Sequence, residues 1–126
     1  MSKASERKVV DVFFALGDGT RLSMVKKLGS EGALSATALS DGASVTRQAI
    51  VKHLQVLHGV GLVTQEKCGR EVLYSLESRR LADARHFIEA ISANWDRRIE
   101  RLRLIVEEPT RRPGSVLRRR KNRRDP

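Results

Sequence analysis

The chain has 126 residues, of which 40% are hydrophobic and only five are aromatic, and its formal net charge is +10. A chain of this length is expected to form one domain with a small, mainly aliphatic core. The sequence contains no apolar run near the ~20 residues that a membrane-spanning helix requires, no apolar signal-peptide core, and a single cysteine, Cys68, which excludes an intrachain disulfide and a thiolate metal cluster within one chain. We therefore expect a cytoplasmic protein with no membrane partner.

The positive charge is concentrated at the C-terminal end. Residues 111–126 hold eight Lys or Arg and one Asp, a net charge of +7, whereas residues 1–110 hold 17 Lys or Arg and 14 Asp or Glu, a net charge of +3. We therefore expect one domain over residues 1–110 and a basic, disordered tail over residues 111–126. Because the domain is only mildly basic, an argument for nucleic-acid binding must rest on where its cations lie.

Two helices are predicted at the N-terminal end. Ser5 is placed to cap a helix over residues 6–16 that is apolar on more than one side. The glycines of residues 17–19 interrupt it, and Thr20 is placed to cap the next helix. The inner side of that second helix is expected to carry Leu22, Val25 and Leu28, with Met24 at its edge.

The next two helices have the spacing of a helix-turn-helix. Ser35 can open a short helix that ends at Leu39, and Thr46 can cap a helix that Gly59 is placed to end. A turn of about four residues containing glycine joins them. In the second helix the apolar positions Ile50, Leu54 and Leu57 should face the core. The outward face is then expected to carry Thr46, Arg47, Gln48, Val51, Lys52 and Gln55.

This outward face has the chemistry that a DNA major groove requires. It carries two cations for phosphates, two amides with paired donors and acceptors for base edges, one hydroxyl and no acid. The alternative interpretation is an ordinary amphipathic helix whose polar face is simply solvated. The segments that follow favour the first interpretation.

A β-hairpin is predicted directly after this helix. The apolar period changes to two, which indicates a strand over residues 62–67, a turn at Cys68-Gly69 and a returning strand over residues 70–76. Attached to a helix-turn-helix, such a hairpin is a wing. Lys67 and Arg70 lie near its tip, where each can reach a phosphate or a minor groove.

A long helix is predicted over about residues 81–107. Its apolar residues recur every three or four positions, which is typical of a coiled-coil stripe. A small core with this much additional apolar surface on the first and last helices suggests that these helices also contact a partner subunit. The residues predicted to form the dimer contact are Val9, Val12, Phe13, Ile88, Ile91, Trp95, Ile99 and Leu102.

No catalytic or metal-binding pattern accompanies these elements. The sequence has no Gly-rich phosphate loop, no Ser/His/Asp arrangement and no paired-carboxylate motif. Its three histidines are scattered, whereas zinc requires three or four ligands in concert. His53 is expected to pack beneath the second helix of the helix-turn-helix or to reach a phosphate. We predict no enzymatic activity, no cofactor and no metal.

Four segments resemble the ArsR-type (arsenic-repressor-like) winged-helix transcriptional regulators. They are Phe14-Ala15-Leu16-Gly17-Asp18-Gly19-Thr20-Arg21-Leu22, Thr46-Arg47-Gln48-Ala49-Ile50-Val51-Lys52-His53-Leu54, Leu57-His58-Gly59-Val60-Gly61-Leu62-Val63 and Gly69-Arg70-Glu71-Val72-Leu73-Tyr74. The resemblance implies a mainly α fold with a small β-hairpin wing, a dimeric winged helix-turn-helix. It also implies a homodimer in bacterial cytoplasm that represses an operator until a signal releases it.

The sequence departs from that family at functional positions. Metal-sensing members carry a Cys-x-Cys near the start of the helix before the turn, where this chain has Ala36-Thr37-Ala38-Leu39. Other members place carboxylate and histidine ligands on the last helix, where this chain offers Asp83, His86, Asp96 and Glu100 but no second histidine. Val51 stands where small polar residues are common in similar proteins.

The sequence as a whole predicts a sequence-specific DNA-binding transcriptional regulator. In this interpretation it is a repressor that binds an inverted-repeat operator in double-stranded DNA as a homodimer. The alternative is a winged-helix interaction module that binds RNA or an acidic protein partner through its basic surface and tail.

Overall fold

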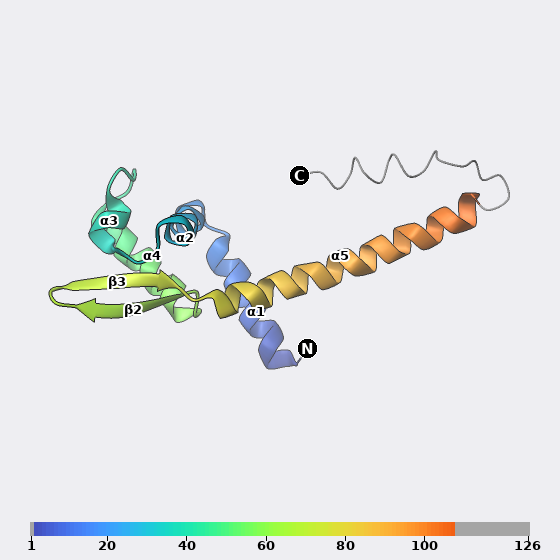
Figure 1. Ribbon diagram of the computed structural model, residues 1–126, viewed down its shortest axis with the longest axis horizontal. Helices are drawn as coiled ribbons and strands as arrows, with labels where there is room; N and C mark the ends of the chain where they lie inside the picture. Colours follow the sequence, from blue (N-terminus) through green and yellow to red (C-terminus); the bar gives the residue numbers. More distant parts are fainter. Residues whose placement is uncertain (1, 108–126) are drawn as a thin grey trace. The chain divides into compact units, whose positions relative to one another are not determined.

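The computed structural model describes residues 2–107, which form helices and one small sheet (Figure 1). The contacts divide the chain into two compact units, Met1–Ile88 and Glu89–Pro126. The predicted basic tail, residues 111–126, lies outside the described residues. In chain order the elements are α1 (Lys3–Leu16), α2 (Gly19–Glu31), β1 (Leu34–Ser35), α3 (Ala36–Ser40), α4 (Arg47–Gly59), β2 (Val63–Cys68), β3 (Glu71–Leu76) and α5 (Ser78–Glu107). The predicted mainly helical fold with a small wing is confirmed.

The caps of α3 and α4 are the predicted ones. Ser35 accepts a hydrogen bond from the backbone N–H of Ala38, and Thr46 accepts one from that of Ala49, each at 3.1 Å. Each hydroxyl satisfies one of the N–H groups that the first helical turn leaves without a partner. The two helices of the helix-turn-helix therefore begin where the sequence predicts.

The caps of α1 and α2 differ from the prediction. Ser2 caps α1, which begins three residues earlier than expected, and Ser5 is the residue whose N–H it accepts, at 3.1 Å. Asp18, not Thr20, caps α2, and its Oδ2 accepts from the N–H of Arg21 at 2.9 Å. An ionised carboxylate is a stronger acceptor than a hydroxyl. The Arg21 N–H in turn holds the pKa of Asp18 below its ordinary value of 3.8.

The inner side of α2 is rotated from the expected one. Met24 and Leu28 are buried, with exposed fractions of 4% and 2%, whereas Leu22 is 45% exposed. A step of three residues turns a helix by about 300°, which is about 60° short of a full turn. Leu22 and Leu28 are two such steps apart, so they lie about 120° apart around the helix. The core therefore takes Met24, Val25 and Leu28, and the prediction for Leu22 was wrong.

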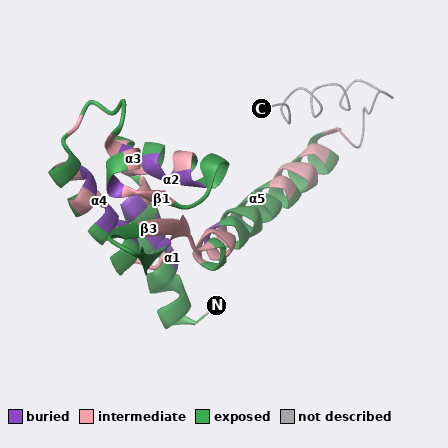
Figure 2. Ribbon diagram, turned by 60° about the vertical axis from the view of Figure 1, so that its left-hand side comes forward, coloured by how far each residue is buried: buried purple, intermediate pink, exposed green. Residues whose placement is uncertain are grey.

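The core of the first unit lies against the inner side of α4. Ile50, Leu54 and Leu57 are at most 1% exposed and pack in one cluster with residues of α1, α2 and α3 and with Leu62 and Val63 (Figure 2). Val51 is half-buried against the same cluster. The inward prediction for α4 is confirmed, while Val51 is less outward than expected.

The junction after α4 depends on Gly61 and not on Gly59. Helix α4 includes Gly59, and the left-handed backbone occurs at Gly61, where φ is +82°. A Cβ atom at Gly61 would also lie 3.1 Å from Nε of Arg80. Glycine is favoured there because its backbone adopts this conformation without strain and because it leaves room for the Arg80 side chain.

The sheet has three strands in the order β1-β3-β2, all antiparallel, where the sequence predicts two. The extra strand, Leu34–Ser35, pairs Leu34 with Tyr74. Two residues are too few to produce a period of two, which explains why the strand was missed. The hairpin turn is Gly69-Arg70, one residue later than predicted, because Gly69 supplies the positive φ of +65° that a two-residue turn requires.

Helix α5 begins at Ser78, three residues before the predicted start. Its first turns belong to the Met1–Ile88 unit, where Leu81 and Ala84 pack against the core and the rings of Phe87 and Phe13 lie 6.2 Å apart. Within residues 2–107, no helix combines the length and apolar character that a membrane span requires.

Candidate nucleic-acid interface

The first turns of α4 present a polar surface with no acidic side chain. Thr46, Arg47, Gln48, Lys52 and Gln55 are all exposed on this helix, while its other side is buried in the core. Among the six predicted residues of this face, only Val51 is half-buried. The structure therefore brings the predicted set together on one helix and leaves its polar members accessible.

Arg47 makes a contact that the sequence did not predict. Its Nε donates a hydrogen bond to the Thr37 hydroxyl oxygen at 3.0 Å, which links α4 to the helix before the turn. The two residues are ten apart in sequence, so no helical periodicity relates them. Only the crossing of α3 and α4 brings them together, and for that reason the sequence did not reveal the contact with Thr37.

Helix α3 is held in place from several sides. The ammonium of Lys27 on α2 donates to the carbonyl oxygen of Ala38 at 3.3 Å. The hydroxyl of Ser40 donates to the carbonyl oxygen of Thr37 at 2.9 Å, and Leu39 is buried in the core. The Thr37 side chain therefore stands on a short helix with a defined position next to α4.

His53 lies behind the polar face of α4. Its Nδ1 is 3.3 Å from Nη1 of Arg21 and 3.9 Å from Oδ2 of Asp18. A guanidinium can only donate, so Nδ1 is the acceptor in the contact with Arg21. The Nε of Arg21 also donates to the carbonyl oxygen of Ala15 at 2.8 Å, and its guanidinium lies 5.6 Å from the ring centroid of Phe14. These contacts connect His53 of α4 to the start of α2. Of the two roles expected for His53, they agree with packing beneath α4.

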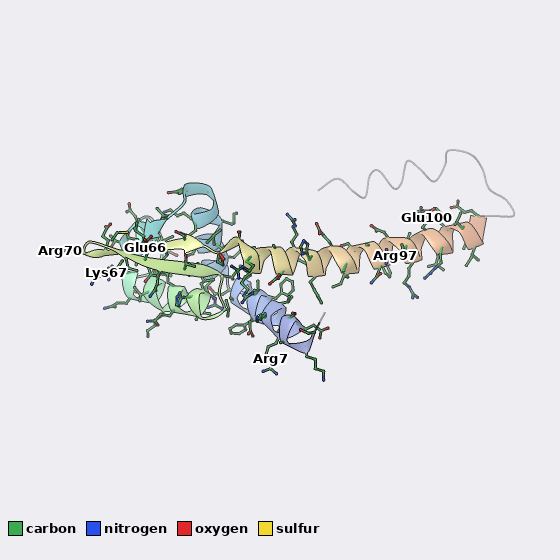
Figure 3. The ribbon with its side chains drawn as sticks, turned by 60° about the horizontal axis from the view of Figure 1, so that its bottom comes forward. Arg7, Glu66, Lys67, Arg70, Arg97 and Glu100 are labelled. Atoms are coloured by element: carbon green, nitrogen blue, oxygen red, sulfur yellow. The ribbon has the colours of Figure 1, made fainter. Side chains whose placement is uncertain are left out.

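The wing carries cations near its tip. Lys67 is the next-to-last residue of β2, and Arg70 lies in the turn (Figure 3). Alternate residues of a strand point to opposite faces, so Lys67 shares a face with Val63, whose side chain is buried in the core beside α4. Glu66 points to the other face. The alternation along β2 therefore places Lys67 and Glu66 on opposite faces. The net charge of the segment does not reveal this separation.

Cys68 is exposed at the end of β2 and forms no disulfide. Within residues 2–107 no three or more His, Cys, Asp and Glu side chains gather in a group that could hold a metal ion. Of the ligand types noted on the last helix, Asp83 pairs with Arg80, with Nη1 and Oδ2 3.3 Å apart.

The predicted dimer residues fall into two groups. Val9 and Val12 are buried within the chain, at 2% and 0% exposed, so their assignment to a subunit contact is corrected: they are core residues. The neighbouring Val10 and Phe14 are instead 62% and 68% exposed. Ile99 is half-buried. The predicted residues that do expose apolar surface are Phe13, Ile88, Ile91, Trp95 and Leu102.

Comparison with known proteins agrees with this geometry. The family model described as a helix-turn-helix domain matches residues 16–66. The chain is 40% identical over 65 residues to the uncharacterized HTH-type transcriptional regulator YuzN of Bacillus subtilis, a match that spans 47% of this chain and 71% of that protein. An ArsR-like transcriptional regulator from Rhodococcus sp. RHA1 has a similar structure, with a TM-score of 0.70 and 37% identity over 81% of this chain and 95% of that chain.

The chain belongs to the ArsR-type family of helix-turn-helix transcriptional regulators. It is also 37% identical over 68 residues to the HTH-type transcriptional repressor SmtB of Mycobacterium tuberculosis, a match that spans 54% of this chain and half of that protein. Members of the ArsR-type family are DNA-binding regulators of transcription and not enzymes. The exposed face of α4 and the wing are therefore parts of a DNA-binding domain.

Proposed function

We propose that this ArsR-type protein is a repressor that binds an inverted-repeat operator as a homodimer. The observation that carries the proposal is the acid-free exposed face at the start of α4, capped by Thr46 and backed by a buried core side. In helix-turn-helix proteins the first turns of the second helix enter the major groove. The wing, with Lys67 and Arg70 near its tip, is proposed to add contacts to the DNA backbone or the minor groove.

Within α4 the side chains suit different DNA groups. Arg47 can donate two parallel hydrogen bonds to guanine O6 and N7, and Gln48 can pair with adenine N6 and N7. Val51 offers only methyl groups, which suit a thymine methyl. Lys52 and Gln55 lie further along the helix, and the flexible ammonium of Lys52 suits a phosphate.

The homodimer is proposed from exposed apolar surface. Ile91, Trp95 and Leu102 of α5 are 54%, 59% and 59% exposed and follow the spacing of a coiled-coil stripe. In α1, Val10 and Phe14 are exposed as well. Large apolar side chains that recur exposed along one face of a helix mark a contact with another chain. A second copy would cover both surfaces and place two α4 helices on DNA with two-fold symmetry.

Repression is proposed from the name of a relative, and a cytoplasmic location is proposed because a repressor must reach its operator. SmtB is named a transcriptional repressor, and a repressor acts by occupying its operator.

Sequencing the DNA fragments that the purified protein retains from a random pool tests the proposal. We expect two matching half-sites in inverted order, with centres one helical turn or a multiple of it apart. Retention of RNA in preference to duplex DNA would contradict it. A single half-site without a symmetric copy would contradict the homodimer alone.

A further inference from the structure

The contact between Thr37 and Arg47 has a geometric consequence for base recognition. The guanidinium is planar and donates through Nε and through two terminal amino groups. Nε is engaged with the Thr37 hydroxyl at 3.0 Å. The terminal amino groups can then point away from α3 as a fixed fork, which is the arrangement that pairs with guanine O6 and N7.

Both residues are exposed, so this hydrogen bond contributes little to folding. Its effect is on the conformation of a long side chain. A free arginine on a helix surface loses rotamer freedom when it binds DNA, and this loss lowers affinity. An arginine already held by Thr37 has lost part of that freedom before DNA arrives.

The residue that holds Arg47 is itself held. Lys27 of α2 donates to Ala38 at 3.3 Å, and Ser40 donates to the carbonyl oxygen of Thr37 at 2.9 Å. Leu39, two residues after Thr37, is 3% exposed in the core. The position of the Thr37 hydroxyl is therefore set by the fold and not by the DNA.

We propose that Thr37 is a positioning residue that orients the Arg47 guanidinium for a guanine, so that α3 as well as α4 sets base preference. The inference rests on the proposed role of Arg47 as a base-reading residue. Thr37 itself need not touch a base. The Thr37 side chain acts through the direction in which the terminal amino groups of Arg47 point.

The test compares variants on a library of single-base changes in the selected operator. Thr37→Val keeps the shape of the side chain and removes the acceptor, whereas Thr37→Ser keeps the acceptor. We expect Thr37→Val to reduce discrimination about two- to tenfold at the base pair that Arg47→Ala also relaxes, which corresponds to the ordering cost of one long side chain. Thr37→Ser should retain most of the discrimination.

Two further measurements separate positioning from a backbone contact or a general effect on α3. Added to Arg47→Ala, the Thr37→Val change should have no further effect on base preference, because the group that it orients is gone. Ser44→Ala, a control that removes an exposed hydroxyl in the turn between α3 and α4, should leave base preference unchanged.

The outcomes that overturn the inference are distinct from failure of the proposed function. Equal loss of affinity for every sequence in Thr37→Val would make Thr37 a backbone contact, and unchanged discrimination would mean that it orients nothing. If Arg47→Ala relaxes no base pair while the protein still selects an operator, Arg47 does not read bases and the inference fails, although the DNA-binding function stands. If no operator is selected, the proposed function fails as well.

Discussion

Helices α4 and α5 have apolar residues at similar spacing, but these residues are buried in α4 and exposed in α5. In α4, Ile50 is 1% exposed, and Leu54 and Leu57 are fully buried. In α5, Trp95 and Leu102 are each 59% exposed. Both stripes return every three or four residues, so each helix has one apolar side.

The difference shows what an apolar stripe specifies. The stripe determines which side of a helix avoids water, but not whether the chain itself supplies the surface that covers it. For α4 the covering residues come from α1, α2, α3 and the root of the wing. For the exposed stripe of α5 we propose a second copy. The two helices should therefore respond differently to truncation of a large apolar side chain.

Trp95→Ala should have the largest effect of these substitutions, and it should weaken the association of two chains. If a second copy buries the indole, its removal costs about 3–5 kcal/mol of dimer stability. The matched control is Leu104→Ala, because Leu104 lies nine residues and so about two and a half turns away, on the opposite side of the helix. Sedimentation at micromolar concentration should show dissociation of the first variant only. A wild-type protein that sediments as a stable monomer would contradict the comparison.

Leu54→Ala should act on folding within one chain. Leu54 is fully buried, so its truncation should lower the free energy of unfolding by about 2–5 kcal/mol. Chemical denaturation at several protein concentrations distinguishes this loss from the loss in Trp95→Ala, whose size should depend on concentration. A Leu54→Ala variant as stable as the wild type would mean that the core is not where the structure has it.

Lys52→Ala removes a side chain from the exposed side of α4, and its effect can be compared with that of Leu54→Ala on the buried side. The side chain is exposed, so the free energy of unfolding should change by no more than about 0.5 kcal/mol. Binding should weaken about equally for all DNA sequences, and the slope of log K against log salt should fall by about 0.9 if one phosphate contact is lost. A change of base preference would instead assign Lys52 to a base edge.

Asp18→Asn should have the smallest effect, a loss of stability that is present near neutral pH and disappears in acid. The lowered pKa of Asp18 means that its carboxylate stabilises the folded state above the ordinary value of 3.8, and that this contribution disappears as the pH falls through the folded-state pKa. Asparagine still caps a helix but does not titrate. The stability difference between the wild type and the variant should therefore narrow below about pH 4. A difference that stays constant from pH 6 to pH 3 would rule out this assignment.

Local sequence predicted only part of what local interactions determine, because the caps predicted for α3 and α4 were right and those predicted for α1 and α2 were wrong. Ser35 and Thr46 cap their helices because a cap needs only the next three residues, and Leu54 is buried as its spacing predicts. Gly69 was expected in the hairpin turn for the same reason. The exposed polar residues of α4 could also be predicted, since one helix carries them all.

Features that depend on how elements cross could not be predicted in this way. Met24 is buried and Leu22 exposed because of the direction in which α2 meets its neighbours. Strand β1 exists because β3 lies beside it. Val12 is buried because α1 packs against the rest of the core. Thr37 and Arg47 contact each other only because the turn brings α3 and α4 together.

The most direct test of the central claim is the binding of Gln48→Ala to the library of single-base operator changes. If the first turns of α4 read bases in the major groove, the variant should lose about 1–3 kcal/mol on the operator and relax preference at one base pair in each half-site. If it loses affinity uniformly, with no position relaxed, Gln48 contacts the backbone and the proposed placement of α4 on DNA is wrong.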